Sequence, residues 1–108
     1  MSEAEAVADE RTLATLSAFK RDVLWILNDG GEQKGVDIRL SLEDYYGKPV
    51  NHGQLYPNLD DLVDAGLVDK AKLDGRTNGY SLTEAGRRAL TKRQTWQGGS
   101  DASGGETA

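Results

Sequence analysis

The stretch N-H-G-Q-L-Y-P-N-L-D-D-L-V-D-A-G-L-V-D-K-A-K-L-D-G-R-T-N-G-Y-S-L, residues 51–82, decides the fold of this chain. In order, it predicts a capped helix, a glycine stop, a strand, a basic turn and a returning strand. A helix followed directly by a hairpin is the arrangement of a recognition helix and a β-wing, which can contact two parts of a DNA duplex at once. The flanking residues are therefore expected to support this unit.

The helix of this stretch is predicted from its cap and its apolar face. Asn51 is an N-cap residue, and Gln54 three positions later gives a pair that resembles a capping box. Gly66 is expected to end the helix. Pro57 conflicts with a start at Asn51, so either the helix begins later, near Gly53, or its first turn is distorted. The inward face is predicted to consist of leucines and a valine at helical spacing: Leu55, Leu59, Leu62 and Val63.

The hairpin is predicted from alternation and from two turn dipeptides. Leu67, Ala71 and Leu73 alternate with Val68, Lys70 and Lys72, which indicates a strand. Residues 74–79 contain both Asp-Gly and Asn-Gly, and the chain returns through Tyr80. Two strands joined by a basic turn are therefore expected.

Three further helices are expected around this unit. Apolar residues at helical spacing from Leu13 to Leu27 predict a first helix that ends at residues 28–31. Residues 36–42 alternate like a strand but also fit one helical face; helix is favoured because the run continues to Tyr46 and Pro49 follows. Thr83 is expected to cap a last helix that runs to about Trp96.

The length of 108 residues is that of one domain with a small core. Residues 1–10 are an acidic segment that either extends the first helix or frays. Residues 11–96 are expected to form the folded domain. Residues 97–108 have no apolar side chain larger than Ala and are expected to be a disordered tail.

Composition excludes several kinds of function. The chain has no Cys and one His, so a disulfide, a thiol sensor and a zinc site built from protein ligands alone are not expected. No apolar run approaches ~18 residues and no signal peptide is visible, which predicts a cytoplasmic protein without a membrane span. The sequence contains no P-loop, G-x-G-x-x-G motif or catalytic triad spacing, so neither an enzyme nor a cofactor is expected.

The net charge of −5 at pH 7 is unusual for a DNA-binding protein. Six of the 18 acidic residues lie in the first ten and last twelve positions, whereas all 13 Lys and Arg lie between Arg11 and Arg93. Residues 11–96 carry 13 basic and 12 acidic side chains, a balance of +1. The acidic excess is thus peripheral. Acidic surfaces with few lysines are typical of proteins from a molar-salt cytoplasm, which we take as a hypothesis of origin.

Two segments resemble the PadR family of transcriptional regulators: G-Q-L-Y-P-N-L-D-D-L-V-D-A-G-L-V (53–68) and Y-S-L-T-E-A-G-R-R-A-L (80–90). The resemblance covers roughly residues 13–96. It implies an α+β, mostly α, winged helix-turn-helix with three helices, a two-stranded β-wing and a C-terminal dimerisation helix. The acidic composition is similar to that of haloarchaeal members, which include an oxidative-stress regulator. The absence of Cys excludes direct thiol sensing of such a stress.

Base-reading residues are expected at the start of the recognition helix. Asn and Gln can pair with adenine through two hydrogen bonds, and a glycine allows the backbone to approach closely. The alternative is that Asn51 and Gln54 only cap the helix and Tyr56 only packs. The candidates are Asn51, His52, Gly53, Gln54, Tyr56 and Asn58.

Basic residues of the wing are candidate contacts to the DNA backbone. Arg76 lies at the tip of the turn, from which it could enter a minor groove. Lys70, Lys72 and Lys48 are candidate phosphate contacts, with a solvated surface as the alternative. A second basic cluster lies at residues 87–93, and three roles are possible for it. It could contact flanking phosphates, offset an acidic segment of a partner chain, or complement the dipole of the last helix.

A homodimer is expected from the resemblance, because the small subgroup of this family dimerises through its first and last helices. The predicted interface residues are Leu16, Trp25, Ala89, Leu90 and Trp96.

The expected function is sequence-specific binding of double-stranded DNA in transcription control, on a pseudo-palindromic site. Monovalent cations are expected near the DNA interface, beside Asp60 and Asp61. A winged-helix adaptor that binds proteins is the alternative.

Overall fold

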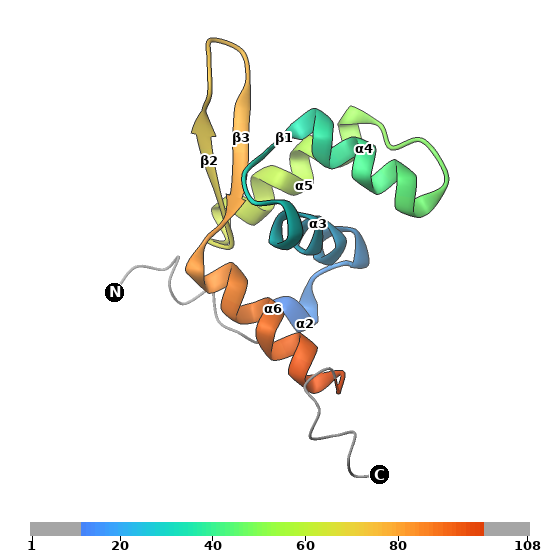
Figure 1. Ribbon diagram of the computed structural model, residues 1–108, viewed down its shortest axis with the longest axis vertical. Helices are drawn as coiled ribbons and strands as arrows, with labels where there is room; N and C mark the ends of the chain where they lie inside the picture. The colour runs from blue at the N-terminus through green and yellow to red at the C-terminus, as the bar shows by residue number, and fades with distance from the viewer. Residues whose placement is uncertain (1–11, 99–108) are drawn as a thin grey trace.

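The structure is a computed structural model that describes residues 12–98. The predicted acidic segment and all but two residues of the predicted tail lie outside these described residues. The elements, in chain order, are α2 (Thr12–Thr15), α3 (Ala18–Gly30), β1 (Gln33–Lys34), α4 (Gly35–Tyr46), α5 (His52–Asp64), β2 (Val68–Lys72), β3 (Asn78–Leu82) and α6 (Glu84–Trp96) (Figure 1). This is the predicted winged helix-turn-helix, mostly helical.

The sheet has three antiparallel strands in the order β1-β3-β2, one strand more than predicted. β2 and β3 form the wing, which projects beyond the helices (Figure 1). The additional strand β1 pairs Gln33 with Tyr80 and Lys34 with Gly79. A strand of two residues is too short to show alternation, so no pattern in the sequence predicts it.

The predicted first helix is interrupted in the described structure. α2 ends at Thr15, and α3 begins at Ala18 after a break at residues 16 and 17. The Ser17 hydroxyl accepts a hydrogen bond from the Lys20 N–H at 3.2 Å and caps α3. Serine favours such a cap over a helix interior, because its side chain competes for backbone donors.

The ambiguous segment 36–42 is helical. α4 buries Ile38 and Leu42, which are spaced four residues apart, and it ends at Gly47 in the left-handed conformation with φ of 71°. Helical spacing therefore describes the buried side chains of this segment, and the alternating pattern does not. Val36 and Leu40 of the same helix stay exposed.

α5 begins at His52, so the alternative start near Gly53 is wrong. The predicted cap is confirmed, because the Asn51 Oδ1 accepts a hydrogen bond from the Gln54 N–H at 2.8 Å. Pro57 lies inside the helix and removes the donor that the Gly53 carbonyl would otherwise receive. Both residues are exposed, so water can replace that donor.

The core lies where α3, α4, α5, α6 and the base of the wing meet. α5 contributes Leu55, Leu59 and Leu62, each without exposed surface, as its apolar spacing predicted. Burial of each leucine stabilises the fold by about 1.5–3 kcal/mol. One face of α5 is thereby fixed inward, and its polar face is turned to solvent.

Only the first residue of β2 packs into the core. Val68 is the only buried residue of β2, and the alternating Ala71 and Leu73 are exposed. The Asn-Gly dipeptide does not form the turn: Asn78 and Gly79 already pair with β2. The tip of the wing is therefore held by local hydrogen bonds, without a hydrophobic core beneath it.

α6 is tied to the end of α5 by its cap. The Thr83 Oγ1 accepts from the Gly86 N–H at 2.9 Å and donates to the Gly66 carbonyl at 2.7 Å. The lack of a side chain at Gly86 lets α6 approach the Leu67 backbone carbonyl, which a Cβ at this position would overlap. A glycine in this first turn of α6 is therefore a packing requirement.

We expect Gly86→Ala to lower the free energy of unfolding by about 1–3 kcal/mol, the usual cost of overpacking a rigid contact. At a solvent-exposed helix position the same change raises the free energy of unfolding by roughly 0.5–1 kcal/mol. The sign of the change therefore shows whether Gly86 is in close contact. Gly75→Ala is the control, because a Cβ there meets nothing within 4 Å. Urea unfolding of both variants measures the effect, and a Gly86→Ala protein as stable as the wild type would contradict the close approach.

Candidate DNA-binding surface

The turn between α4 and α5 is held by one carboxylate. The Glu43 Oε2 accepts hydrogen bonds from the Val50 N–H at 2.9 Å and from the Arg39 Nη1 at 3.1 Å. The Val50 bond, with help from the Arg39 charge and against the effect of burial, lowers the pKa of Glu43. This carboxylate therefore fixes the residue that precedes the cap of α5.

The start of α5 presents exposed polar groups, as predicted. His52, Gly53 and Gln54 are exposed. The Gln54 side-chain amide has no hydrogen-bond partner among the described residues, whereas the Asn51 Oδ1 is engaged in the cap. Asn58 is half-buried, and its amide donates to the Gln54 carbonyl at 2.6 Å. Gln54 is therefore the candidate with its full hydrogen-bonding capacity available.

Tyr56 both packs and lines a hollow. Its ring is half-buried and covers Gly35, where a Cβ would overlap it. The His52 ring meets it edge-on, with centroids 5.6 Å apart. The packing alternative is thus part of its role, and its ring also borders the space between α5 and the wing.

A hollow of about 280 Å³ separates the start of α4 from the wing. Lys34 and Arg76 bring two positive charges to it from different elements. Lys34 is also the N-cap of α4 and makes no side-chain cap, so the first N–H groups of that helix have no cap acceptor. Two cations beside free N–H groups suit a phosphate. The lining residues are Lys34, Gly35, Val36, Tyr56, Arg76, Thr77, Asn78 and Tyr80.

Lys34 is a candidate that the sequence reasoning missed. It is a single lysine between Gln33 and Gly35, with Glu32 nearby, so no pattern distinguished it from a solvated lysine. Only its pairing with Gly79 in β1 brings it to the wing. An isolated lysine directly before a helix would have been the available sign.

The tip of the wing is organised by Asp74. Its Oδ1 accepts from the N–H groups of Arg76 at 3.0 Å and Thr77 at 2.9 Å. These backbone bonds, first that of Arg76, hold the pKa of Asp74 below its usual value. The predicted contact residue Arg76 is exposed and is carried by this turn.

The predicted phosphate contacts differ in their surroundings. Lys48 and Lys72 are exposed and form no ion pair within the described part of the chain. Lys70 lies 3.5 Å from the Asp60 carboxylate, so a phosphate would compete with that carboxylate for the ammonium group. Asp61 is likewise paired, with Lys20 at 3.1 Å. The carboxylates predicted to attract cations thus already have ammonium partners in the free chain.

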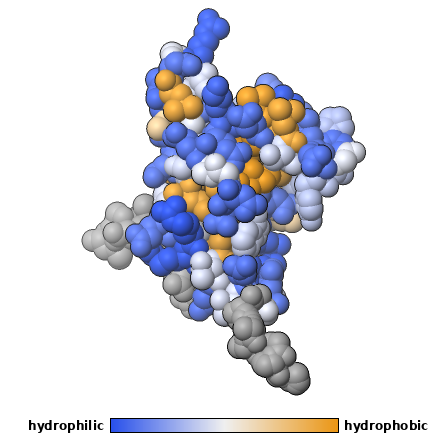
Figure 2. Space-filling model, in the orientation of Figure 1, coloured by the Kyte–Doolittle hydropathy of each residue, from blue (hydrophilic) through white to orange (hydrophobic). Residues whose placement is uncertain are grey.

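The second basic cluster lies apart from this surface. Its members are on α6, which lies at the opposite end of the molecule from the wing tip (Figure 1). Figure 2 shows strongly hydrophilic side chains over this helix and also at the tip of the wing. Arg88 pairs with Glu84 at 3.3 Å, and Arg93 stacks on Trp96 at 5.2 Å. The structure thus separates this cluster from the start of α5 and from the wing tip, and its role stays open.

The predicted interface residues fall into two groups. Leu16 and Trp25 are half-buried, and Trp96 is 75% exposed. Ala89 and Leu90, in contrast, belong to the core of the single chain, with 0% and 2% exposed. α6 turns these two side chains inward against its own protomer, so they have no surface to offer a partner.

Comparison with protein-family models matches residues 23–92 to the transcriptional regulator PadR-like family, which is more than half of the chain. The chain belongs to the PadR family. It is therefore a DNA-binding transcriptional regulator of the winged-helix type. Within residues 12–98 no helix is long and apolar enough to cross a membrane, and no group of three or more His, Cys, Asp and Glu residues could hold a metal ion.

Solved structures place this PadR-family member near RosR of Halobacterium salinarum. The hsRosR-S1 complex structure is 45% identical with a TM-score of 0.77, over 84% of this chain and 83% of that chain. RosR grown from NaBr is 46% identical with a TM-score of 0.75, over 82% and 83%.

A more distant similarity is to Bacillus subtilis PadR in complex with operator DNA, at 28% identity and a TM-score of 0.59. This match covers 69% of this chain and 45% of that chain. A comparison with curated proteins gave no match.

We expect Glu43→Gln to destabilise the fold near neutral pH, because it removes the charge that strengthens the Val50 bond. A lowered folded-state pKa gives stability that is present above the ordinary pKa of about 4.5 and is lost as pH falls below it. The gap between the urea midpoints of the two proteins should therefore shrink from pH 7 to pH 3.5. Asp44→Asn, an exposed carboxylate on α4, is the control; a gap independent of pH would contradict this role.

We expect Asp74→Ala to weaken DNA binding more than Asp74→Asn, by roughly 3-fold or more, because only asparagine keeps an acceptor for the Arg76 and Thr77 N–H groups. Both variants remove the same negative charge, so their difference isolates the turn. Fluorescence anisotropy with a selected duplex measures affinity, and urea unfolding of both variants shows that each is fully folded at the temperature of the binding measurement. Equal affinities would mean that Arg76 needs no fixed turn.

Proposed function

We propose that this PadR-family regulator binds a pseudo-palindromic DNA site as a homodimer and reads bases with the start of α5. The observation that carries the proposal is Gln54, exposed at the N-terminal end of α5 with its amide unpartnered. A free carboxamide at this end of a recognition helix can form two hydrogen bonds with adenine in the major groove. His52 and Gly53 flank it and would contact neighbouring base edges.

The hollow beside α5 could bind a DNA phosphate and so fix the position of the protein along the duplex. A phosphate between Lys34 and Arg76 would lie next to Tyr56 and the first N–H groups of α4. Such contacts orient a protein on the duplex without reading sequence. Lys48 and Lys72 would extend the contact along the backbone, and Arg76 would reach toward the minor groove.

Exposed aromatic surface on α6 supports the dimer. Trp96 is 75% exposed within one chain, and the Arg93 guanidinium covers one face of its ring. An indole is a frequent centre of an interface because it buries a large area with few rotatable bonds. We propose that Trp96 meets the second copy with Leu16 and Trp25. Two recognition helices would then enter major grooves about 34 Å apart.

Similarity to RosR, at 45% identity, and the net charge of −5 support a role in a halophile. We propose that this role lies in a stress response. In molar salt the Debye length is about 3 Å, so binding depends on contact hydrogen bonds and packing. When Lys70 turns to a phosphate it leaves Asp60 without its partner. We propose that a monovalent cation then takes that place near the DNA.

The test is selection of bound fragments from a random duplex pool at 0.2 M and at 2 M KCl. Enrichment of a palindrome with half-sites one helical turn apart is expected, together with a dimer by sedimentation. Non-palindromic enrichment would contradict the dimer, and no enrichment at either salt would favour the protein-binding adaptor.

On the selected duplex, two variants separate the proposed roles. Gln54→Ala should lose roughly 10-fold in discrimination at one base pair, whereas Lys34→Ala should weaken all sequences alike and lower the salt slope by about one. Gln94→Ala, an exposed glutamine on α6, is the matched control and should change neither. Uniform weakening by Gln54→Ala would remove its base-reading role.

A further inference from the structure

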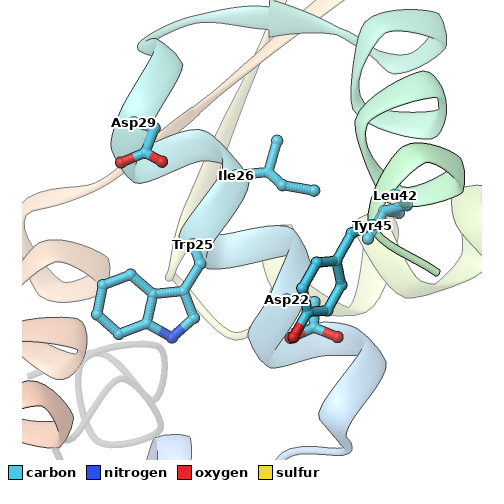
Figure 3. Close-up of a pocket in the computed structure, with 6 residues that line it drawn as sticks. All are labelled: Asp22, Trp25, Ile26, Asp29, Leu42 and Tyr45. Atoms are coloured by element: carbon cyan, nitrogen blue, oxygen red, sulfur yellow. The ribbon is translucent and has the colours of Figure 1, made fainter.

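A hollow of about 350 Å³ lies between α3 and α4 and shares no residue with the DNA-binding surface (Figure 3). Four of its lining residues come from α3 and two from α4. They are Asp22, Trp25, Ile26, Asp29, Leu42 and Tyr45.

Two carboxylates and no basic side chain line this hollow. The Asp22 Oδ2 accepts a hydrogen bond from the Tyr46 hydroxyl at 2.6 Å, which leaves its other oxygen available. Asp29 is exposed and makes no ion pair within the described residues. The hollow therefore carries negative charge that the described chain does not neutralise, and it favours a positively charged occupant.

Aromatic rings supply its walls. Figure 3 shows the Trp25 indole of α3 and the Tyr45 ring of α4 on opposite sides, with Ile26 on the helix between them. Tyr45 is 77% exposed, although tyrosine normally gains from burial of its ring. Ring faces attract cations, most strongly those of Trp and Tyr.

The residues that line the hollow favour an organic cation over a metal ion. Hard metal ions take six or more oxygen ligands, and no group of three or more His, Cys, Asp and Glu within residues 12–98 could hold one. Most of the lining is apolar or aromatic. We propose that this hollow binds a small organic cation, an ammonium group with alkyl or aryl substituents, whose charge faces the two aspartates and whose apolar part lies between Trp25 and Tyr45.

The experiment uses ¹H–¹⁵N NMR of the full chain in 0.2 M KCl, with benzyltrimethylammonium as the probe. The two tryptophans give two indole N–H signals, which Trp96→Phe assigns. The Trp25 signal should shift to saturation in the millimolar range or below, while Trp96 stays unchanged. Benzyl alcohol and benzoate, which are neutral and anionic, should give no saturable shift.

Two lining variants test the assignment of charge and ring. Asp29→Asn and Tyr45→Ala change exposed side chains, so the fold should persist, and each should raise Kd roughly 3-fold or more. Asp64→Asn, an exposed carboxylate on α5 outside the hollow, should leave Kd unchanged. Equal binding of benzyl alcohol, or unchanged Kd in both lining variants, would overturn the proposal.

Trp25 is also part of the proposed dimer contact, so the titration is made at one fixed protein concentration at which the chain is dimeric. A Trp25 signal that the cation does not shift in this dimer would also overturn the proposal, because the second copy of the chain would then cover the hollow. These outcomes do not depend on DNA binding, so failure here and failure of the proposed function are distinguishable.

Discussion

Burial of the leucine stripe of α5 is the constraint on which the rest of the structure depends. Leu55, Leu59 and Leu62 have no exposed surface, and together they contribute a large part of what holds a core this small. Once they face inward, the helix has no rotational freedom left. The exposed position of Gln54 and the half-buried position of Tyr56 are consequences of that packing. The positions of the proposed base-reading residues are thus set by the apolar residues on the opposite face of the helix.

The wing follows a different principle, because it has no core of its own beyond Val68. Its base is stabilised by β1, which pairs with β3 and brings Lys34 beside the hairpin. Its tip is stabilised by the Asp74 carboxylate, which accepts two backbone hydrogen bonds. A segment held mainly by hydrogen bonds can adjust to a duplex more easily than one packed against the core. Arg76 lies at the tip of the wing, in the segment that is held by hydrogen bonds.

Acidic residues in this chain do more than raise its negative charge. Glu43 holds the turn before α5, Asp74 holds the wing, and Asp60 and Asp61 pair with lysines. Each of these carboxylates has a local partner within the described residues, so their charge is partly compensated where DNA is proposed to bind. Asp22 and Asp29 differ, since no basic side chain lines the hollow that they face. Asp22 still accepts a hydrogen bond from the Tyr46 hydroxyl, so of these two only Asp29 has no hydrogen-bond or ion-pair partner among the described residues.

The sequence alone determined the features that depend on local chemistry: the Asn51 and Thr83 caps, the inward leucines of α5, and the wing between residues 68 and 82. Caps, turns and amphipathic spacing act within a few residues, so they are visible in one dimension. Only the tertiary structure decided the rest. It added β1, turned Ala89 and Leu90 inward, and brought Lys34 to Arg76. These features depend on contacts between residues far apart in the chain, for which periodicity and spacing hold no information.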